Sequence, residues 1–244
     1  MQCKLCLKNK PLCKKSHIVP NFMYRELFDA DHKFAYVSLK EVRERDVQTG
    51  EFEADILCLD CEGKFSKWES YAKTVLYGGQ LPRGNNIHME NQRNQHGVEF
   101  TYIKGIDYTK FKLFLLSVLW RSSISRRPLF KNIALGPYEE KLRSVLLAED
   151  PGPAHAYPCV MSTYRNHKLP VEIVGEPRKI TRGGAAYSFL INGVLYYFYI
   201  THKSTKDWVL EAAINKAGEL RVVHMPERES KKILNSYFGA DLFK

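Results

Sequence analysis

Two CxxC pairs, far apart in the chain, constrain its fold more than any other feature of the sequence. Cys3 and Cys6 form the first pair, and Cys58 and Cys61 form the second. Zinc prefers four tetrahedral ligands, and a CxxC turn places its two sulfur atoms on one side of the backbone. Two such turns that meet face to face therefore enclose one ion. We predict a structural Zn²⁺ that clamps the residues between the pairs into a folded lobe.

The other two cysteines, Cys13 and Cys159, have no CxxC partner. Free buried thiols are the first interpretation for both, although Cys13 is close enough to the first pair to be a spare ligand. The sequence contains no apolar run of the roughly 18 residues that a membrane helix needs, and it begins without an apolar signal segment. We therefore expect a cytoplasmic protein with reduced thiols and no membrane partner.

The charge of the chain favours a polyanionic partner. Lys and Arg outnumber Asp and Glu by 37 to 27, which gives a formal net charge of +10 at pH 7. Residues 1–25 carry basic side chains and no acidic one. A local field of this kind attracts nucleic acid by releasing condensed counterions. A solvated basic face is the alternative.

The hydrophobic pattern predicts an α+β protein in three parts. Residues 1–77 contain both CxxC pairs and form the zinc-binding lobe. Residues 78–100 are polar and Asn-rich, and we expect a linker or a long surface loop with exposed His88 and His96. Residues 101–244 would form central helices, an antiparallel sheet and a closing helix that serve recognition or regulation. A protein partner or a second copy of the chain could bind through this last part.

Apolar residues at helical spacing predict the helices. They are expected at residues 21–29, at residues 62–77, from Asp107 onward, from Pro137 onward, and at residues 227–238. Gly78 and Gly79 are expected to end the second of these helices. The helix that starts at Asp107 runs toward three cations, which could contact phosphates or could be solvated. These cations are Arg121, Arg126 and Arg127.

Alternating or short apolar runs predict the strands. They are expected within residues 35–39, 47–57, 171–175, 186–202 and 209–226. Asn192-Gly193 predicts a tight hairpin turn, and a second turn is expected near Gly218. The aromatic run Leu195–Ile200 fits a strand that is buried on both faces better than a surface on which bases stack.

The first third of the chain has a particular order of motifs. CKLC (3–6) is followed by SHIVP (16–20), and ILCLDCE (56–62) then leads into the predicted helix. This order resembles that of the treble-clef HNH endonucleases. The resemblance implies that DNA phosphodiesters are the substrate and that His17 is the general base that activates water. It also implies that a divalent metal ion is bound by the residue before His17 and by a residue at the start of the helix that follows the second CxxC pair. An Asn between these two positions would orient the histidine. Such stand-alone nucleases often belong to mobile elements or to bacterial defence against phage.

The chemistry of phosphodiester hydrolysis suits these residue types. Attack on a charged phosphate needs a deprotonated water and a cation near the leaving oxygen. An imidazole titrates near neutrality and suits the first task. Glu62 offers a hard oxygen ligand for Mg²⁺ or Mn²⁺. Four lysines would line the approach of the nucleic-acid backbone, namely Lys14, Lys15, Lys64 and Lys67.

The chain departs from the family pattern at three places. Ser16 stands where an acidic or imidazole ligand usually precedes the histidine, Glu62 stands where a histidine usually follows the last cysteine, and EAD (53–55) occupies the region of the Asn. His17 could instead be a hydrogen-bonded core residue or could brace a zinc ligand. A non-catalytic zinc-binding protein that holds nucleic acid or a protein partner is therefore the second hypothesis. An RNA-directed nuclease with the same site is the third.

Overall fold

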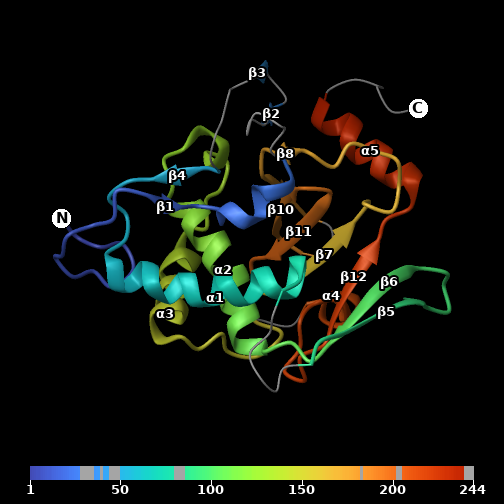
Figure 1. Ribbon diagram of the computed structural model, residues 1–244, viewed down its shortest axis with the longest axis horizontal. Helices are drawn as coiled ribbons and strands as arrows, with labels where there is room; N and C mark the ends of the chain where they lie inside the picture. The colour runs from blue at the N-terminus through green and yellow to red at the C-terminus, as the bar shows by residue number, and fades with distance from the viewer. Residues whose placement is uncertain are drawn as a thin grey trace.

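The fold places a group of helices against one face of a mixed β-sheet (Figure 1). It was obtained as a computed structural model, which describes residues 1–27, 36–38, 41–43, 50–79, 86–181, 184–201 and 205–238. In this part of the chain the α-helices are α1 (Leu59–Tyr77), α2 (Tyr108–Ile124), α3 (Pro137–Ala148), α4 (Asp207–Ala212) and α5 (Glu227–Phe238), and the 3₁₀ helices are η1 (Asn21–Leu27) and η2 (Pro128–Phe130). The prediction of an α+β protein is confirmed.

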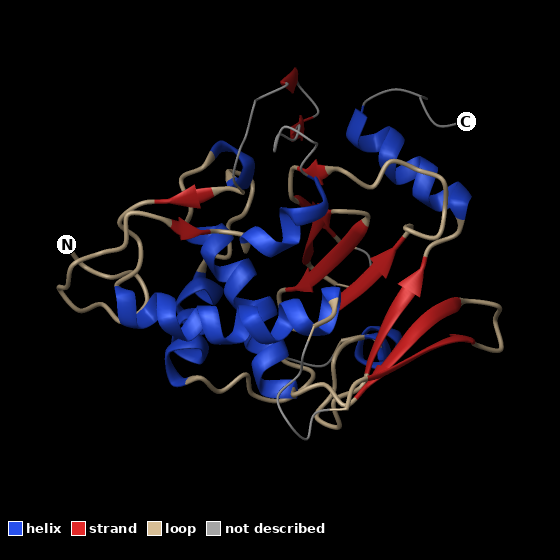
Figure 2. Cartoon of the chain, in the orientation of Figure 1, coloured by secondary structure: helices blue, strands red, loops and turns tan. Residues whose placement is uncertain are grey.

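The strands form a small sheet and a large one (Figure 2). The small sheet pairs β1 (Ser16–His17) with β4 (Phe52–Glu53). The large sheet contains, in chain order, β2 (Tyr36–Ser38), β3 (Glu41–Arg43), β5 (His88–Arg93), β6 (Glu99–Lys104), β7 (Cys159–Thr163), β8 (Val174–Gly175), β9 (Arg178–Ile180), β10 (Ala186–Ile191), β11 (Val194–Tyr199) and β12 (Leu220–His224). Its spatial order is β3-β2-β8-β10-β11-β7-β12-β6-β5, with β9 beside β10.

The prediction that the large sheet is antiparallel is wrong, because the sheet is mixed. Strand β12 runs parallel to β7, and β2 runs parallel to β8. The hairpin of β10 and β11 is confirmed, with Ile191 opposite Val194. Asn192 and Gly193 between them both have positive φ, at 51° and 71°, as a type I′ turn requires. Periodicity predicted this local pairing, but the direction of strands that are far apart in sequence depends on the tertiary path.

Helices α1 and α2 form the centre of the helical group. Cys58 is the N-cap of α1, and Gly78, with φ of 78°, is its C-cap, so the predicted end is confirmed. Asp107 caps α2 and accepts a hydrogen bond of 3.0 Å from the backbone of Lys110. Helix α2 is buried around its whole circumference from residue 111 to 122. A helix of this kind belongs in the interior of a protein.

Three segments differ from the predictions. Residues 207–212 form α4, where a strand was expected, because only Val209 and Ala212 turn inward and their spacing is helical. Strand β5 lies in the expected linker; all six of its side chains are exposed, so no alternation marks it in the sequence. Strand β7 was not predicted, since its first four residues are all buried and show no period.

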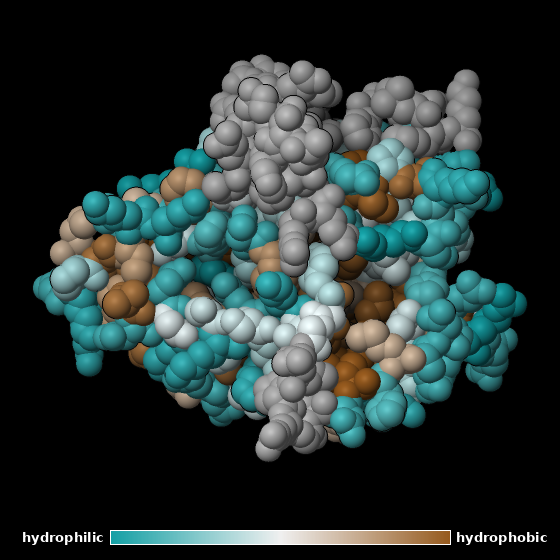
Figure 3. All heavy atoms as spheres, viewed as in Figure 1, coloured by the Kyte–Doolittle hydropathy of each residue, from teal (hydrophilic) through white to brown (hydrophobic). Residues whose placement is uncertain are grey.

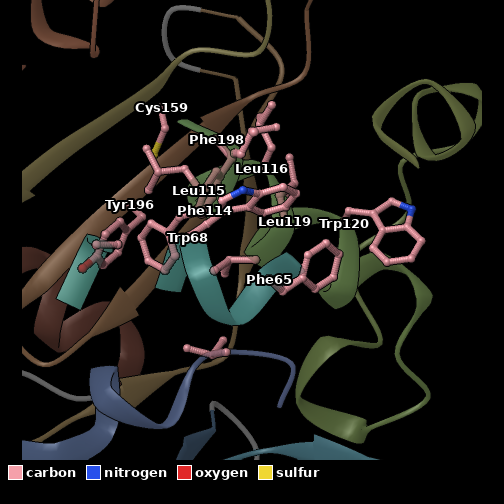
Figure 4. Close-up of a cluster of buried hydrophobic side chains, with 14 of the residues drawn as sticks. Phe65, Trp68, Phe114, Leu115, Leu116, Leu119, Trp120, Cys159, Tyr196 and Phe198 are labelled. Carbon is pink, nitrogen blue, oxygen red and sulfur yellow. The ribbon is translucent and has the colours of Figure 1, made fainter. Parts of the chain in front are cut away.

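A continuous hydrophobic core joins the helices to the sheet (Figure 4). Phe65 and Trp68 of α1 contribute to it together with Phe114 of α2, and Tyr196 and Phe198 of β11 contribute from the sheet. This core includes residues from Cys3 to Leu220. Within the described residues, the helices are too short or too polar to cross a membrane.

Candidate functional site

Four cysteine side chains meet at the N-terminal end of α1. The sulfur atoms of Cys3, Cys6, Cys58 and Cys61 all lie within 4.8 Å of one another, and those of Cys6 and Cys58 are 3.9 Å apart. In a tetrahedral site with Zn–S bonds of about 2.3 Å, neighbouring sulfurs are about 3.8 Å apart. The four cysteines can therefore hold one metal ion such as Zn²⁺, as their spacing in the sequence predicts.

Backbone hydrogen bonds bring the two CxxC turns together. The amide of Leu7 donates to the carbonyl of Cys3 at 2.9 Å, and Leu7 adopts a φ of 58° to close the first turn. The amide of Lys4 donates to the carbonyl of Ile56 at 2.9 Å. The amide of Cys58 donates to the sulfur of Cys3 at 3.4 Å. The first turn is thus held directly against the start of α1.

The two remaining cysteines lie outside this cluster. Cys13 donates its amide to the carbonyl of Leu57 at 2.8 Å, and its side chain is not among the four that converge. Cys159 is buried in β7. Both have free thiols, and the expected burial holds for Cys159, whereas Cys13 is partly exposed.

The protonation of the cluster is uneven. Burial raises the pKa of the Cys3 thiol, and burial together with neighbouring Cys58 raises that of Cys61. Burial acts in the same direction on Cys6, but the backbone amide of Lys8 and the other thiols lower its pKa to about 7. A metal ion binds the thiolate form, so its binding would release protons from this cluster.

A second group of polar side chains lies beside the cysteines, where β1 meets the first turn of α1. The hydroxyl of Ser16 is fully buried and donates a hydrogen bond of 3.0 Å to Oε2 of Glu62. Strand β1 pairs with β4 so that Ser16 lies opposite Glu53 and His17 lies opposite Phe52. The structure therefore brings the residue before His17 into contact with the carboxylate that follows the last cysteine.

Arg121 supplies the positive charge of this group. Its side chain is completely buried at the C-terminal end of α2, and its guanidinium lies 2.6 Å from Oε1 of Glu69. It also donates hydrogen bonds to the carbonyl of His17 at 2.6 Å and to Ser117. The face of Phe65 lies 5.0 Å from the guanidinium carbon. Arg121 thus links three separate segments of the chain.

The imidazole of His17 is half-buried, and its edge packs against the ring of Phe52. Its Nε2 is buried and has no hydrogen-bond partner among the described residues. Burial lowers the pKa of His17, Lys15 and Arg121 lower it further, and Glu69 opposes them. No hydrogen bond between His17 and Glu62 is found in the described part of the chain, and both side chains interact electrostatically with Arg121 and Glu69.

Burial has the opposite effect on Glu62, because it disfavours the charged carboxylate. It raises the pKa of Glu62, and the charge of Glu69 adds to this effect. Arg121 and the hydroxyl of Ser16 act in the other direction.

Glu53 lies in the region where the HNH pattern would have an Asn. It accepts hydrogen bonds from the hydroxyl of Ser125 and the amide of Arg126, both at 2.9 Å. Its carboxylate therefore ties the segment that follows α2 to β4.

The basic residues expected to contact nucleic acid are in different environments. Lys14, Lys15 and Lys67 are exposed. Lys64 forms an ion pair of 2.5 Å with Glu149. Figure 3 shows a mainly hydrophilic surface at the zinc-lobe end of the visible face (left), with a few hydrophobic side chains between the polar ones.

The three arginines also differ from one another. The side chain of Arg126 is 81% exposed, and Arg127 forms an ion pair of 2.6 Å with Glu51. Arg121 is 0% exposed and all its contacts are internal, so it cannot contact phosphates from the surface. The expectation of a phosphate contact is corrected for this residue.

The sequence reasoning missed Glu69 and the internal role of Arg121. Both had a detectable signal. Glu69 lies seven residues after Glu62, which places the two on the same face of one helix. Arg121 continues the spacing of Phe114 and Val118 along the buried face of α2. A charge at such a position indicates a buried partner.

Comparison of the chain with protein-family models, with curated proteins and with solved structures gave no match.

Proposed function

We propose that the protein is a metal-dependent, HNH-like endonuclease that hydrolyses DNA phosphodiesters, with residues 1–77 as its catalytic lobe of the treble-clef type. The observation that carries this proposal is the hydrogen bond of 3.0 Å between Ser16 and Glu62. It joins the strand that bears His17 to the first turn of α1, directly after the cysteine cluster. This is the juxtaposition that the order of motifs implies for a nuclease of this type.

The oxygens of Ser16 and Glu62 are compatible with a divalent cation. Glu62 would supply a carboxylate oxygen, and the Ser16 hydroxyl, which donates to it at 3.0 Å, would turn its oxygen toward the ion. Mg²⁺ sites commonly combine one or two carboxylates with water and substrate phosphate. Such an ion would neutralise the charge that develops on the leaving oxygen.

His17 has two properties of a proton acceptor, a ring nitrogen without a hydrogen-bond partner in the described part of the chain and a lowered pKa. Its buried Nε2 would have to become accessible to water when DNA binds. Its Nε2 has no partner among the described residues, and Arg121 fixes the backbone of the strand through the carbonyl of His17. A neutral imidazole can take a proton from water, and its lowered pKa keeps it neutral at physiological pH. The exposed Lys14 and Lys15 lie three and two positions before His17 and would attract the DNA backbone.

A plasmid-nicking assay tests the proposal. The purified, zinc-loaded protein should nick supercoiled DNA with Mg²⁺ or Mn²⁺ and should be inactive when neither of these ions is added. His17→Ala should lose activity by roughly 10²–10⁴-fold, the usual effect of removing a general base. His88→Ala removes an exposed histidine from β5 and is the matched control, with unchanged activity expected. Equal zinc content and circular dichroism in all three proteins would exclude a loss of fold. Nicking by His17→Ala at the wild-type rate would contradict the assignment.

A non-catalytic module that binds nucleic acid or a protein partner is the second candidate. It is favoured by the ion pair of Arg121 and Glu69, which gives the buried carboxylates a permanent counter-charge without a metal ion. If wild type and His17→Ala are both inert and retard DNA equally in a gel, this second function replaces the first. A parallel assay on RNA separates a DNA-directed from an RNA-directed enzyme.

A further inference from the structure

The two faces of the large sheet have different coverings. Side chains alternate along β11, so Tyr196 and Phe198 enter the core beneath α1 and α2 while Tyr197 and Tyr199 lie on the opposite, outer face. The outer face carries two separate apolar clusters. One includes Leu234 and Tyr237 of α5, and the other includes Val209 and Ala212 of α4. The outer face is thus covered by α5 at one place and by α4 at another.

A pocket of about 880 Å³ lies on this outer face between α4, α5 and the turn of the β5–β6 hairpin. Small-molecule sites usually occupy roughly 300–1,000 Å³. Val160, Ser162, Tyr197 and Tyr199 of the sheet line it, and Trp208 lines it from α4. No residue of the cysteine cluster or of the Ser16–Glu62 group contributes to it. The pocket is therefore a separate site.

Trp208 is unusually exposed for a large aromatic side chain. Its exposed fraction is 44%, whereas the other tryptophans, Trp68 and Trp120, are 3% and 1% exposed. Its ring meets the ring of Tyr199 at 80°, with 6.3 Å between the centroids. This edge contact holds the indole in place. An aromatic ring that is both exposed and fixed beside a pocket offers a surface for stacking a planar ligand.

Ser162 places an unsatisfied polar group in the same pocket. The residue is 5% exposed, and its hydroxyl has no hydrogen-bond partner within the described part of the chain. A buried hydroxyl without a partner destabilises a fold, because it has lost its hydrogen bonds to water. A ligand that donates to or accepts from this hydroxyl would restore the bond.

Two histidines that line the pocket are anchored within the fold through Nε2. Nε2 of His167 lies 2.7 Å from the carbonyl of Met225, which can only accept, so Nε2 carries a hydrogen. Nε2 of His224 lies 2.8 Å from the hydroxyl of Thr101. Nδ1 is the second polar atom of each ring.

We infer that this pocket binds the base of a nucleoside or mononucleotide, stacked on Trp208 and hydrogen-bonded through its edge to Ser162. A nucleobase is planar and carries ring acceptors together with donors, which matches a hydroxyl, two imidazoles and an indole. Lys206 and Glu229 line the pocket with opposite charges. A lining of mixed charge does not favour a polyanion such as a nucleic-acid strand. We therefore assign a single nucleotide base as the ligand of this pocket. This assignment does not depend on the nuclease activity of the other site.

Ligand-observed NMR on the zinc-loaded chain of 244 residues tests this inference. Saturation transfer to AMP and CMP should be strongest at the base protons of at least one of them, and ribose 5-phosphate, which lacks a base, should receive none. Trp208→Ala should weaken binding by roughly 5- to 150-fold, the effect of losing one stacking ring. Leu147→Ala changes a partly exposed apolar residue of α3, away from the pocket, and should bind as wild type does.

Ser162→Ala separates a ligand-binding role from a structural one. The variant should not lower the melting temperature, because no bond within the described chain is lost, yet it should weaken binding several-fold. Absence of binding to both nucleotides would overturn the inference, as would equal binding of ribose 5-phosphate. Affinities in both pocket variants equal to that of wild type would also overturn it. None of these readouts involves DNA cleavage, so failure here is distinct from failure of the proposed nuclease.

Discussion

At the scale of single residues, the most consequential side chain is Arg121. A charge that is completely removed from water is costly unless it is paired and hydrogen-bonded. Arg121 meets this requirement through Glu69, the carbonyl of His17 and Ser117. The same contacts connect α2 with α1 and with β1. One guanidinium therefore fixes the positions of the groups on which the proposed chemistry depends.

Arg121→Met should destabilise the protein by about 3–5 kcal/mol, because it leaves the Glu69 carboxylate partly buried without its cation. Urea unfolding monitored by circular dichroism measures this change. Adding Glu69→Gln to the variant should restore part of the loss, since the uncompensated charge is then removed. Arg126→Met is the matched control; its side chain is 81% exposed, and a change within about 0.5 kcal/mol is expected. A loss below 1 kcal/mol in Arg121→Met would contradict the assigned role.

Lys112 is a second buried cation, on the other side of α2. It is 2% exposed, and its ammonium donates to the carbonyl of Pro153 at 2.6 Å and to the hydroxyl of Tyr108 at 2.9 Å. Burial lowers its pKa to about 7; Lys216 acts in the same direction and Asp150 opposes it. The unfolded chain keeps this proton until the ordinary pKa of 10.5. Between these two values the unfolded state binds more protons than the folded state.

The stability contributed by Lys112 should therefore rise with pH between about 7 and 10, by up to about 1.4 kcal/mol per pH unit. Below pH 7 both states hold the proton and the contribution is constant. Chemical unfolding of wild type and Lys112→Met at pH 6, 7, 8 and 9 checks this. The unfolding free energy of wild type minus that of Lys112→Met should increase with pH only above pH 7. Lys110→Met, on the exposed side of the same helix, controls for the loss of a lysine. A difference that does not vary with pH would contradict the prediction.

At the scale of elements, the N-terminal segment is held mainly by the start of α1. Residues 1–13 contain no helix or extended strand. They contact the rest of the lobe through the bridge of Leu12 with Cys58, a few backbone hydrogen bonds and the ion pair of Lys10 with Asp60. We expect a segment with so little regular structure to depend on metal ligation by the four cysteines, because metal binding and folding form one equilibrium.

Removal of the metal should therefore unfold this segment before the large sheet. Zinc analysis should give one ion per chain for wild type and for Cys13→Ser, whose sulfur lies outside the cluster. Cys58→Ser should bind close to none. Hydrogen exchange should then lose protection in residues 1–20 and at the start of α1, while β10 and β11 keep theirs. Loss of zinc in Cys13→Ser, or full protection of residues 1–13 without metal, would show that the ligand set or its role is different.

At the scale of the whole molecule, the N-terminal lobe that carries the cysteine cluster and the sheet share their interior. One buried cluster contains Cys61 of the lobe, Phe114 of the central helices and Phe198 of the sheet. Helices α1 and α2 pack directly on each other within it, as Figure 4 shows for Phe65 and Leu119. Neither part can open without exposing apolar surface of the other.

The zinc-loaded protein should consequently unfold in one cooperative transition. Melting curves from far-ultraviolet circular dichroism and from tryptophan fluorescence should coincide, since Trp68 and Trp120 report on the shared core and the dichroism reports on all helices and strands. Two separated transitions would mean that the lobe and the sheet domain are independent units, with a boundary near residue 78.

Local signals in the sequence predicted much of the fold and part of the site. The two CxxC pairs indicated the four converging thiols, because the geometry of each pair is set within a single turn. Helical periodicity located α1, α2, α3 and α5, and Asn192-Gly193 located the hairpin. These features depend on residues only a few positions apart, so no knowledge of the tertiary path was needed.

The tertiary structure decided what depends on distant segments. It determined that β12 runs parallel to β7, that Arg121 is internal, and that Ser16 contacts Glu62. It also created the pocket beside Trp208, whose walls come from strands, helices and a turn far apart in the chain. The physical reason is that burial and ion pairing depend on which surfaces meet in three dimensions, whereas the sequence by itself determines which residues can form a turn, a helix or a strand.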